Sequence, residues 1–177
     1  SAPHGVSQVR LGESKFPEPG SLGLALEVQE LTGAHLIAKT QNLNDDANFD
    51  EICPYKEKLK RYIKENKIKY LIDFHGLSKK KPIDINLGVN FGVNVKPNEK
   101  LFDFLNERLT KKGFVVSIDQ PFCGKSGTIS GYIAKELEIW TIQVEVNCKY
   151  TNEAKYVSYL KDLIDCVVQT IEMSQKM

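Results

Sequence analysis

Apolar residues recur along the chain in two different patterns, and each pattern predicts one kind of element. Spacings of three and four residues predict helices, whereas short runs of branched and aromatic residues predict strands. The predicted helices cover residues 21–32, 55–67, 97–112 and 152–173, with a shorter one that ends near Leu137. The predicted strands cover residues 34–39, 68–74, 83–89, 114–118 and 140–147.

Turn residues and polar stretches separate these elements. Ser21 is a suitable N-cap for the first helix, Gly33 follows its end, and Pro54 precedes the second helix. The Asn- and Asp-rich stretch 41–54 is too polar for a regular element and predicts a loop. The lysines of the helix at 55–67 are expected on a solvated face.

Strands that alternate with helices predict an α/β fold. We expect three layers, with a mixed, mostly parallel central sheet and helices on both of its faces. The 177 residues suffice for one full core, and no linker-like stretch divides them. The chain is therefore expected to form a single domain from residue 1 to residue 177.

Composition and charge narrow the choice of partners. The chain is 41% hydrophobic and 27% charged, as is typical of a soluble globular protein, and its net charge is only +1. Such a balance gives no electrostatic reason to expect nucleic acid or an anionic membrane as a partner. No stretch has the length of a membrane span or the pattern of a signal peptide.

The four cysteines, Cys53, Cys123, Cys148 and Cys166, are far apart in the sequence and form no CxxC pair. Their spacing argues against a structural zinc knuckle and against a thioredoxin-type redox motif. We expect free thiols in a reducing compartment, the cytoplasm.

Three polar residues stand out by their positions. His75, in LIDFHGLS, is predicted at the carboxyl end of a buried central strand, where open α/β sheets bind their ligands. Glu145 lies between Val144 and Val146, and burying such a carboxylate is costly unless it is paired, neutralised or placed in a cleft. His4, which like His75 precedes a glycine, could join it on a divalent metal, because zinc binds imidazoles together with a carboxylate.

Each of these residues also has a purely structural interpretation. His75 could be a hydrogen-bonded histidine of the core, His4 could belong to a mobile terminus, and Glu145 could pair with a lysine. His35, inside the predicted strand 34–39, is interpreted as structural. A pair of histidines alone is a weak motif, so the order of several motifs has to decide.

Several motifs in order give the chain a resemblance to a known family. The segments DFHG, DINLGVN, GKSGTISGYI and IQVEVN, preceded by APHG, resemble the N-formylglutamate amidohydrolase family over roughly residues 1–150. That family is similar to zinc carboxypeptidases in fold and catalytic layout. The resemblance implies a zinc carboxypeptidase-like, or phosphorylase/hydrolase-like, fold and a metal-dependent hydrolase.

Carried over to this chain, the resemblance implies that His4, His75 and an acidic residue between them hold zinc or another divalent ion. The family has an acid shortly before the first helix. Glu18 in PEPGS fits that place and is our choice, and Glu13 in LGES is the competing candidate. Glu145 matches the acid of a strand motif in which the family has its general base.

The residue types suit that chemistry. A metal held by two imidazoles and a carboxylate lowers the pKa of bound water to ~7 and polarises a substrate carbonyl. Glu145 would take the water's proton and return it to the leaving amine. Asp73 lies two residues before His75, and we interpret it either as a partner that orients this imidazole or as a simple strand-end cap.

The resemblance also implies substrate-binding residues. Asn48 falls where the family has an Asn that is often followed by Arg, but here Phe49 follows. Arg10 or Lys125 could hold a substrate carboxylate instead, since one cation near the metal suffices. Tyr132, in a segment that resembles the family's Gly-Gly-Tyr, could lend its hydroxyl to the substrate or pack the loop.

Two functions follow from these observations. The first is a zinc-dependent amidohydrolase that cleaves an N-acylated amino acid, similar to N-formylglutamate, or a small peptide. The second is a non-catalytic relative that binds a small carboxylated ligand or a protein partner. A nucleotide-binding domain built on GKSGT is rejected, because no glycine precedes Gly124 by five residues as a P-loop requires. The sequence indicates no oligomeric state.

Overall fold

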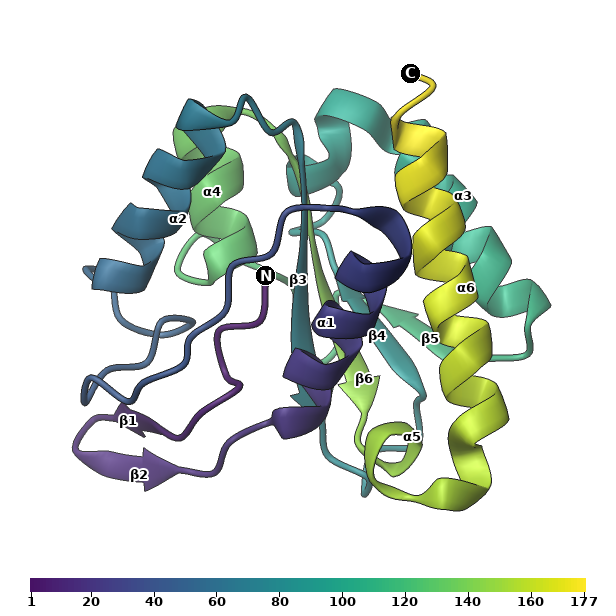
Figure 1. Cartoon of the computed structure of the whole chain (residues 1–177), viewed down its shortest axis with the longest axis horizontal. Coiled ribbons are helices and arrows are strands. Elements are labelled where there is room, and N and C mark those ends of the chain that lie inside the picture. Colours follow the sequence, from purple (N-terminus) through teal and green to yellow (C-terminus); the bar gives the residue numbers. More distant parts are fainter.

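A four-stranded mixed sheet organises the chain (Figure 1). The computed structural model describes residues 1–177, except for the side chain of Pro19. β3 and β6 run parallel, as do β4 and β5, whereas β4 and β6 are antiparallel. The prediction of a mixed, mostly parallel sheet is confirmed. In the order in which they lie in the sheet, the strands are β3 (Tyr70–Leu77), β6 (Trp140–Asn147), β4 (Ile85–Gly88) and β5 (Val116–Ile118).

Helices cover both faces of this sheet. α1, α3 and α6 pack on one face around the larger hydrophobic core, and α2 and α4 form a smaller core on the other (Figure 1). The 3-10 helices η1 (Val93–Asn98) and η2 (Ala154–Tyr156) precede α3 and α6. The α-helices are α1 (Pro19–Thr32), α2 (Pro54–Glu65), α3 (Glu99–Lys111), α4 (Ile129–Leu137), α5 (Lys149–Asn152) and α6 (Val157–Ser174).

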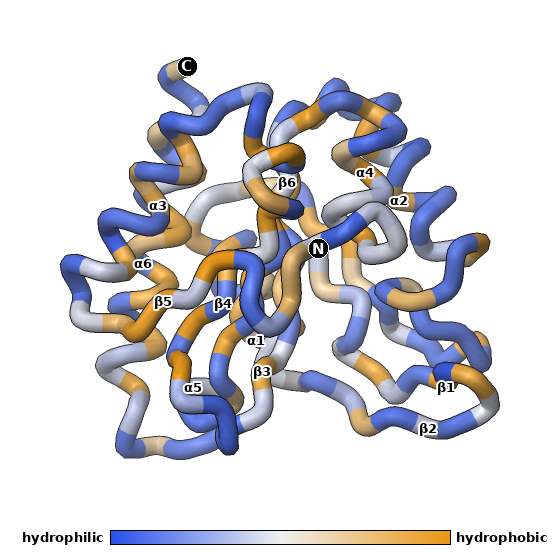
Figure 2. Tube along the Cα trace, turned by 180° about the vertical axis from the view of Figure 1, so that it is seen from behind, coloured by the Kyte–Doolittle hydropathy of each residue, from blue (hydrophilic) through white to orange (hydrophobic). Residues whose placement is uncertain are grey.

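The two faces of β6 differ in polarity, although all eight of its residues are buried. Successive side chains of a strand point to opposite faces, so WTIQVEVN has one apolar face and one polar face. Figure 2 shows this mixture of hydrophobic and hydrophilic positions along the strands. The polar face looks toward α4, because the Thr141 hydroxyl donates to the Ser130 carbonyl at 2.9 Å. The sheet thus has a polar, buried side, and Glu145 lies on it.

The predicted strand at 34–39 does not form. Ala38 makes only an isolated bridge with Ala2, and the first residues of the chain run between this segment and β3. The Phe74 N–H donates to the Ser1 carbonyl at 2.8 Å, so the outer edge of β3 is paired with Ser1. β3 is therefore the end strand of the four-stranded sheet, not a central strand as predicted.

A β-hairpin lies where no element was predicted. β1 (Gln8–Arg10) pairs antiparallel with β2 (Glu13–Lys15). Both residues of the connecting turn have positive φ, 53° at Leu11 and 80° at Gly12. This is the geometry of a type I′ turn, which leucine adopts reluctantly, so the sequence signal for the hairpin was weak.

Several helix boundaries also differ from the prediction. α1 begins at Pro19, with Glu18 rather than Ser21 at the N-cap, and ends as expected at Gly33, whose φ is 66°. α6 begins at Val157, five residues later than predicted, because α5 and η2 occupy the intervening turn.

The lysines of α2 do not all lie on a solvated face. Lys56 is buried, and its Nζ donates to the backbone carbonyls of Asp50 and Gly127, the latter at 2.9 Å. This lysine joins the loop before α2 to the loop before α4. The prediction was wrong at Lys56 because two carbonyl groups replace the water that an exposed ammonium would bind.

All four cysteines are free thiols, two of them buried. Over the described residues, none of the helices combines the length and the apolar character needed to cross a membrane.

Candidate functional site

The structure brings His4, Glu18 and His75 together at the carboxyl half of β3. One potential ligand atom from each residue lies within 4.8 Å of the other two. His4 Nδ1 is 3.2 Å from Glu18 Oε1 and 3.3 Å from His75 Nδ1, and His75 Nδ1 is 3.6 Å from Glu18 Oε2. The two histidines are 71 residues apart in the sequence, so the fold alone makes this cluster. We call these three residues the His–Glu–His cluster.

Gly76 allows the Glu18 carboxylate to lie against β3. The Gly76 N–H donates to Glu18 Oε2 at 2.9 Å. A Cβ at this position would be only 3.3 Å from Glu18 Cγ, so a larger residue would push the carboxylate away from the strand. Glu13, the competing acidic candidate, lies on β2 instead, where it is exposed and pairs with Lys15 at 2.7 Å. Of the two acids, the structure places only Glu18 next to the histidines.

Each imidazole of the cluster is held from behind by a buried aspartate. His4 Nε2 donates to Asp46 Oδ1 at 3.0 Å, and His75 Nε2 donates to Asp73 Oδ2 at 2.9 Å. A carboxylate only accepts hydrogen bonds here, so each Nε2 carries a hydrogen, and each Nδ1 faces the cluster centre, where it can bind either a proton or a metal ion. This carboxylate–histidine arrangement is the one that orients imidazoles for metal binding.

For Asp73, the structure favours the orienting role over that of a strand-end cap. Its carboxylate is completely buried and contacts the His75 ring and the Ser1 hydroxyl. β3 continues two residues beyond His75, to Leu77, so neither Asp73 nor His75 stands at the last position of the strand. His75 therefore lies at the predicted edge of the sheet, but two residues before the end of its strand.

Asp46 is the residue that the sequence analysis missed. Its side chain is fully buried in the loop before α2, where Oδ2 accepts from Arg10 Nε at 2.8 Å and Oδ1 accepts from the Asn48 N–H at 3.0 Å. Several acids occur in this loop, and nothing in the sequence distinguishes Asp46 from its neighbour Asp45, which pairs with Lys39. Only the folded chain shows which of them reaches His4.

The charges of the cluster favour a cation at its centre. Burial alone would raise the pKa of Glu18 and lower that of His75. Hydrogen bonds from both histidines outweigh the first effect and hold the pKa of Glu18 well below its usual range. The charge of Asp73 outweighs the second effect and raises the pKa of His75 well above its usual value. The site therefore binds positive charge, whether protons or a metal ion.

The pKa of Asp46 is also lowered although the carboxyl group is buried. Burial raises the pKa of its carboxyl, but the hydrogen bond from His4 and the ion pair with Arg10 together lower it to about 2. Asp46 is thus ionised at neutral pH and stays a permanent acceptor for His4 Nε2.

Glu145 lies on the strand next to His75. The two residues are direct partners in the parallel register of β3 and β6, so their side chains share one face of the sheet. Gln143 Nε2 donates to Glu145 Oε1 at 2.5 Å. Burial raises the pKa of Glu145 to about 7, although the positive charge of His75 opposes this. A carboxyl group with such a pKa can both accept and release a proton near neutral pH.

The four residues predicted to bind substrate have other contacts in the structure. Arg10 is engaged by Asp46 and lies over the Phe49 ring, 4.9 Å from its centroid. Asn48 Oδ1 accepts from the Ile129 N–H at 2.8 Å and so holds the first turn of α4. The Tyr132 hydroxyl donates to Glu57 on α2, and Lys125 is exposed in the loop before α4. The structure brings none of the four into the described contacts of the His–Glu–His cluster.

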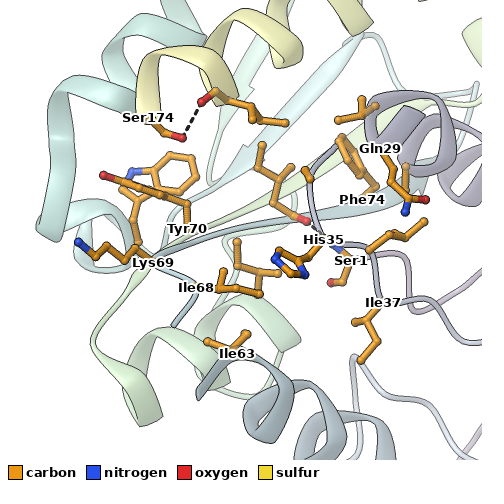
Figure 3. A pocket seen from close by; sticks show the side chains of 18 of the residues that line it. Ser1, Gln29, His35, Ile37, Ile63, Ile68, Lys69, Tyr70, Phe74 and Ser174 are labelled. Atoms are coloured by element: carbon orange, nitrogen blue, oxygen red, sulfur yellow. Dashed lines mark hydrogen bonds between the residues drawn. The ribbon is translucent and has the colours of Figure 1, made fainter. Parts of the chain in front are cut away.

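A cavity of about 300 Å³ lies beside the cluster and is lined by Glu18, His75, Phe16, Leu77, Cys148 and Asn152, among others. The Glu18 side chain is 27% exposed, whereas both histidines are buried, so Glu18 marks the side from which the cluster is reached. A second cavity of about 220 Å³ lies around the amino ends of β3 and β6 and contains no residue of the cluster. Figure 3 shows His35, Ile68 and Tyr70 around this second cavity.

Comparison with solved structures shows that other proteins share this fold. No protein-family model and no curated protein matches the chain. A bacteriophage poly-gamma-glutamate hydrolase superposes with a TM-score of 0.63 at 17% identity, covering 99% of this chain and 83% of that one. The zinc-free form of YndL superposes with a TM-score of 0.56 at 17% identity, covering 98% and 83%.

N-formylglutamate amidohydrolase from Ralstonia eutropha JMP134 superposes with a TM-score of 0.56 at 18% identity, covering 70% of this chain. The chain spans about half the length of that enzyme, 51%. At these identities the likeness establishes the fold alone, and it confirms the expected α/β fold as one that N-formylglutamate amidohydrolase also has.

The buried carboxyl of Glu145 predicts a pH dependence of stability in the metal-free protein. A group whose pKa is higher in the folded chain binds its proton more tightly there, so its contribution is lost as the pH rises from 4.5 through about 7. We expect Glu145→Gln to raise the free energy of unfolding at pH 8 by on the order of 3 kcal/mol and to change it little at pH 4.

Urea titrations in the presence of EDTA at both pH values measure this difference. Glu30→Gln, at an exposed position of α1, is the matched control and should show no such pH dependence. An equal effect of Glu145→Gln at both pH values would contradict the interpretation.

Proposed function

We propose that the chain is a metal-dependent amidohydrolase that cleaves the amide bond of an N-acylated amino acid or a small peptide. The observation that carries this proposal is the convergence of His4, Glu18 and His75 on one point, with Glu145 on the adjacent strand. The shared fold adds support, because the similar structures include hydrolases named for amide substrates. The cytoplasmic location expected from the free thiols belongs to the same proposal.

The donor set of the cluster fits zinc or another divalent ion. Two imidazole nitrogens and one carboxylate oxygen are the ligands of catalytic zinc sites, which keep a further position for water or substrate. The remote nitrogens of both histidines are already occupied by Asp46 and Asp73, so Nδ1 is the nitrogen available on each ring. His4, Glu18 and His75 would hold the ion.

The reaction follows from the positions of the chain's own groups. When bound, the metal supplies a Lewis acid that lowers the pKa of water and polarises the scissile carbonyl. The Glu145 carboxylate accepts a proton from the attacking water and then donates it to the nitrogen of the leaving amine. A pKa of about 7 suits both steps, because neither the protonated nor the ionised form is strongly disfavoured at neutral pH. Gln143 keeps the carboxylate in place through its amide N–H.

The residues predicted to bind substrate take a narrower part in this proposal. Arg10 keeps a half-exposed guanidinium while it holds Asp46, and it is the member of the set that is tied to the cluster. Asn48 fixes the loop that carries Asp46 to the start of α4. We assign Lys125 and Tyr132 to the loop and helix surface beyond the cluster, where they would contact only an extended substrate.

The proposal predicts that metal content and activity are lost together. Purified wild-type protein should contain stoichiometric zinc by elemental analysis and should hydrolyse N-formyl- or N-acetyl-amino acids. His75→Ala removes one of the three ligands, so we expect both zinc and turnover to be lost. His35→Ala is the matched control, because His35 is exposed and contacts Tyr62 instead of the cluster.

The possible outcomes separate the two functions. Zinc bound by wild type without turnover of any acylated amino acid or peptide would favour the non-catalytic relative that binds a carboxylated ligand or a protein. If wild-type protein binds no divalent metal at any ratio of metal to protein, the proposed mechanism is wrong.

Asp46 predicts a second effect on metal binding. Asp46→Asn weakens the acceptor behind His4, so the ring loses its fixed orientation and part of its basicity. We expect zinc affinity to fall by about 10- to 100-fold. Competition with a chromophoric chelator measures this affinity, and Asp45→Asn serves as the neighbouring control because Asp45 pairs with Lys39. An unchanged zinc affinity in Asp46→Asn would show that the aspartate serves only the hairpin.

A further inference from the structure

The cavity beside the His–Glu–His cluster has a solvated aromatic ring at its mouth. Phe16 follows β2 and lines this cavity together with Glu18 and His75. The residue is nevertheless 94% exposed. A phenyl ring that is left in water at the edge of a cleft gains when a ligand covers it, because apolar surface is then removed from water.

The position of Phe16 relative to the cluster is fixed by the backbone. The Glu18 N–H donates to the His4 carbonyl at 2.8 Å, two residues after Phe16. Arg10 on the paired strand β1 is held by Asp46 at 2.7 Å. The hairpin that ends one residue before Phe16 is thus attached to the cluster at its base and along its side, so the backbone at Phe16 stays beside the cavity.

Apart from His75 of the His–Glu–His cluster, the lining of the cavity offers no positive charge to a ligand. Among the described residues that line it, Glu18 is the one acid, and none is a lysine or an arginine. Leu77 and Val146 supply apolar surface, and the polar side chains other than Glu18 and His75 are uncharged: Ser21, Ser78, Cys148, Thr151 and Asn152.

The lysines that lie next to the lining residues in the sequence do not line the cavity themselves. Lys149 follows Cys148, but its Nζ pairs with Asp84 at 2.6 Å. The lysines at 79–81 follow Ser78 in an exposed turn and do not line the cavity. An ion held by the cluster would be occupied by the scissile carbonyl and the water. A carboxylate on the substrate's side chain would therefore lose water near Glu18 with no lysine or arginine of the lining to pair with.

We propose that Phe16 is a specificity-determining residue, and that the cavity takes an uncharged, apolar side chain of the acylated amino acid, which packs against the Phe16 ring. This inference rests on the proposed function and gives it a substrate class. A volume of about 300 Å³ lies at the lower end for ligand pockets and suits a single aliphatic or aromatic side chain. Aromatic and aliphatic groups both pack favourably on a phenyl face.

Hydrolysis of four N-formyl amino acids, those of leucine, phenylalanine, alanine and glutamate, tests this inference in the zinc-loaded protein. We expect wild type to favour leucine and phenylalanine over glutamate in kcat/KM by about tenfold or more. Phe16→Ala should lower kcat/KM for leucine and phenylalanine by about tenfold, mainly through KM, and should change the alanine value little. Leu11→Ala is the matched control, because Leu11 is 84% exposed in the turn of the same hairpin and does not line the cavity.

A binding measurement separates this inference from the proposed function. Ligand-observed NMR gives dissociation constants for N-acetyl-leucine and N-acetyl-glutamate with wild type, Phe16→Ala and Leu11→Ala. We expect wild type and Leu11→Ala to bind the leucine compound more tightly, and Phe16→Ala to lose that preference. If wild type hydrolyses nothing but keeps this preference, the proposed function fails and the inference about the cavity stands. A preference of wild type for glutamate, or an equal loss for all ligands in Phe16→Ala, would overturn the inference.

Discussion

Two hydrogen bonds between buried aspartates and imidazoles determine the arrangement of the site. Asp46 holds His4 and Asp73 holds His75, and each contact leaves the opposite ring nitrogen facing the same point. A buried carboxylate is costly unless it is fully hydrogen-bonded, and both aspartates satisfy this condition through several donors. The rings are therefore oriented before any ion arrives, which reduces the ordering that metal binding would require.

The sheet makes this arrangement possible because one of its faces is apolar and the other is polar. The apolar side chains of β6 pack with α1, α3 and α6 in the larger core. The opposite side chains of the same strand form a buried polar surface that includes Gln143 and Glu145. Gln143 donates to Glu145 while its own Oε1 is buried without a partner among the described contacts. Gln143 thus leaves its amide oxygen without a hydrogen bond while its amide N–H holds the Glu145 carboxylate. This is expected where the position of the carboxylate matters more than local stability.

The sequence was sufficient for those parts of the fold that depend on local pattern. The strand at 140–147 has the predicted limits. His4, Glu18 and His75 lie close together, but no local pattern brings them there, and their role as metal ligands stays a prediction. The prediction failed where distant backbone decides. The segment 34–39 lost its place in the sheet because Ser1 and Ala2 lie beside β3.

Asp46 illustrates a different limit of sequence reasoning. Its importance comes from a contact with His4 across 42 residues and from an ion pair with Arg10. No local spacing encodes either contact, since a loop of several acids offers many equivalent carboxylates. Periodicity finds buried faces, but the partner of a single buried charge depends on how the loops close over the sheet.

The backbone hydrogen bond from Glu18 to the His4 carbonyl closes the chain into a loop whose two ends are both at the cluster. Between these ends, β1, its turn and β2 form a hairpin that is also held along one side by the ion pair between Arg10 and Asp46. Residues could be added to or removed from the tip without moving either end, because loop-closure entropy changes only slowly with loop length. The same fold could in this way carry a different hairpin beside the cavity and bind different ligands, while the His–Glu–His cluster keeps its position.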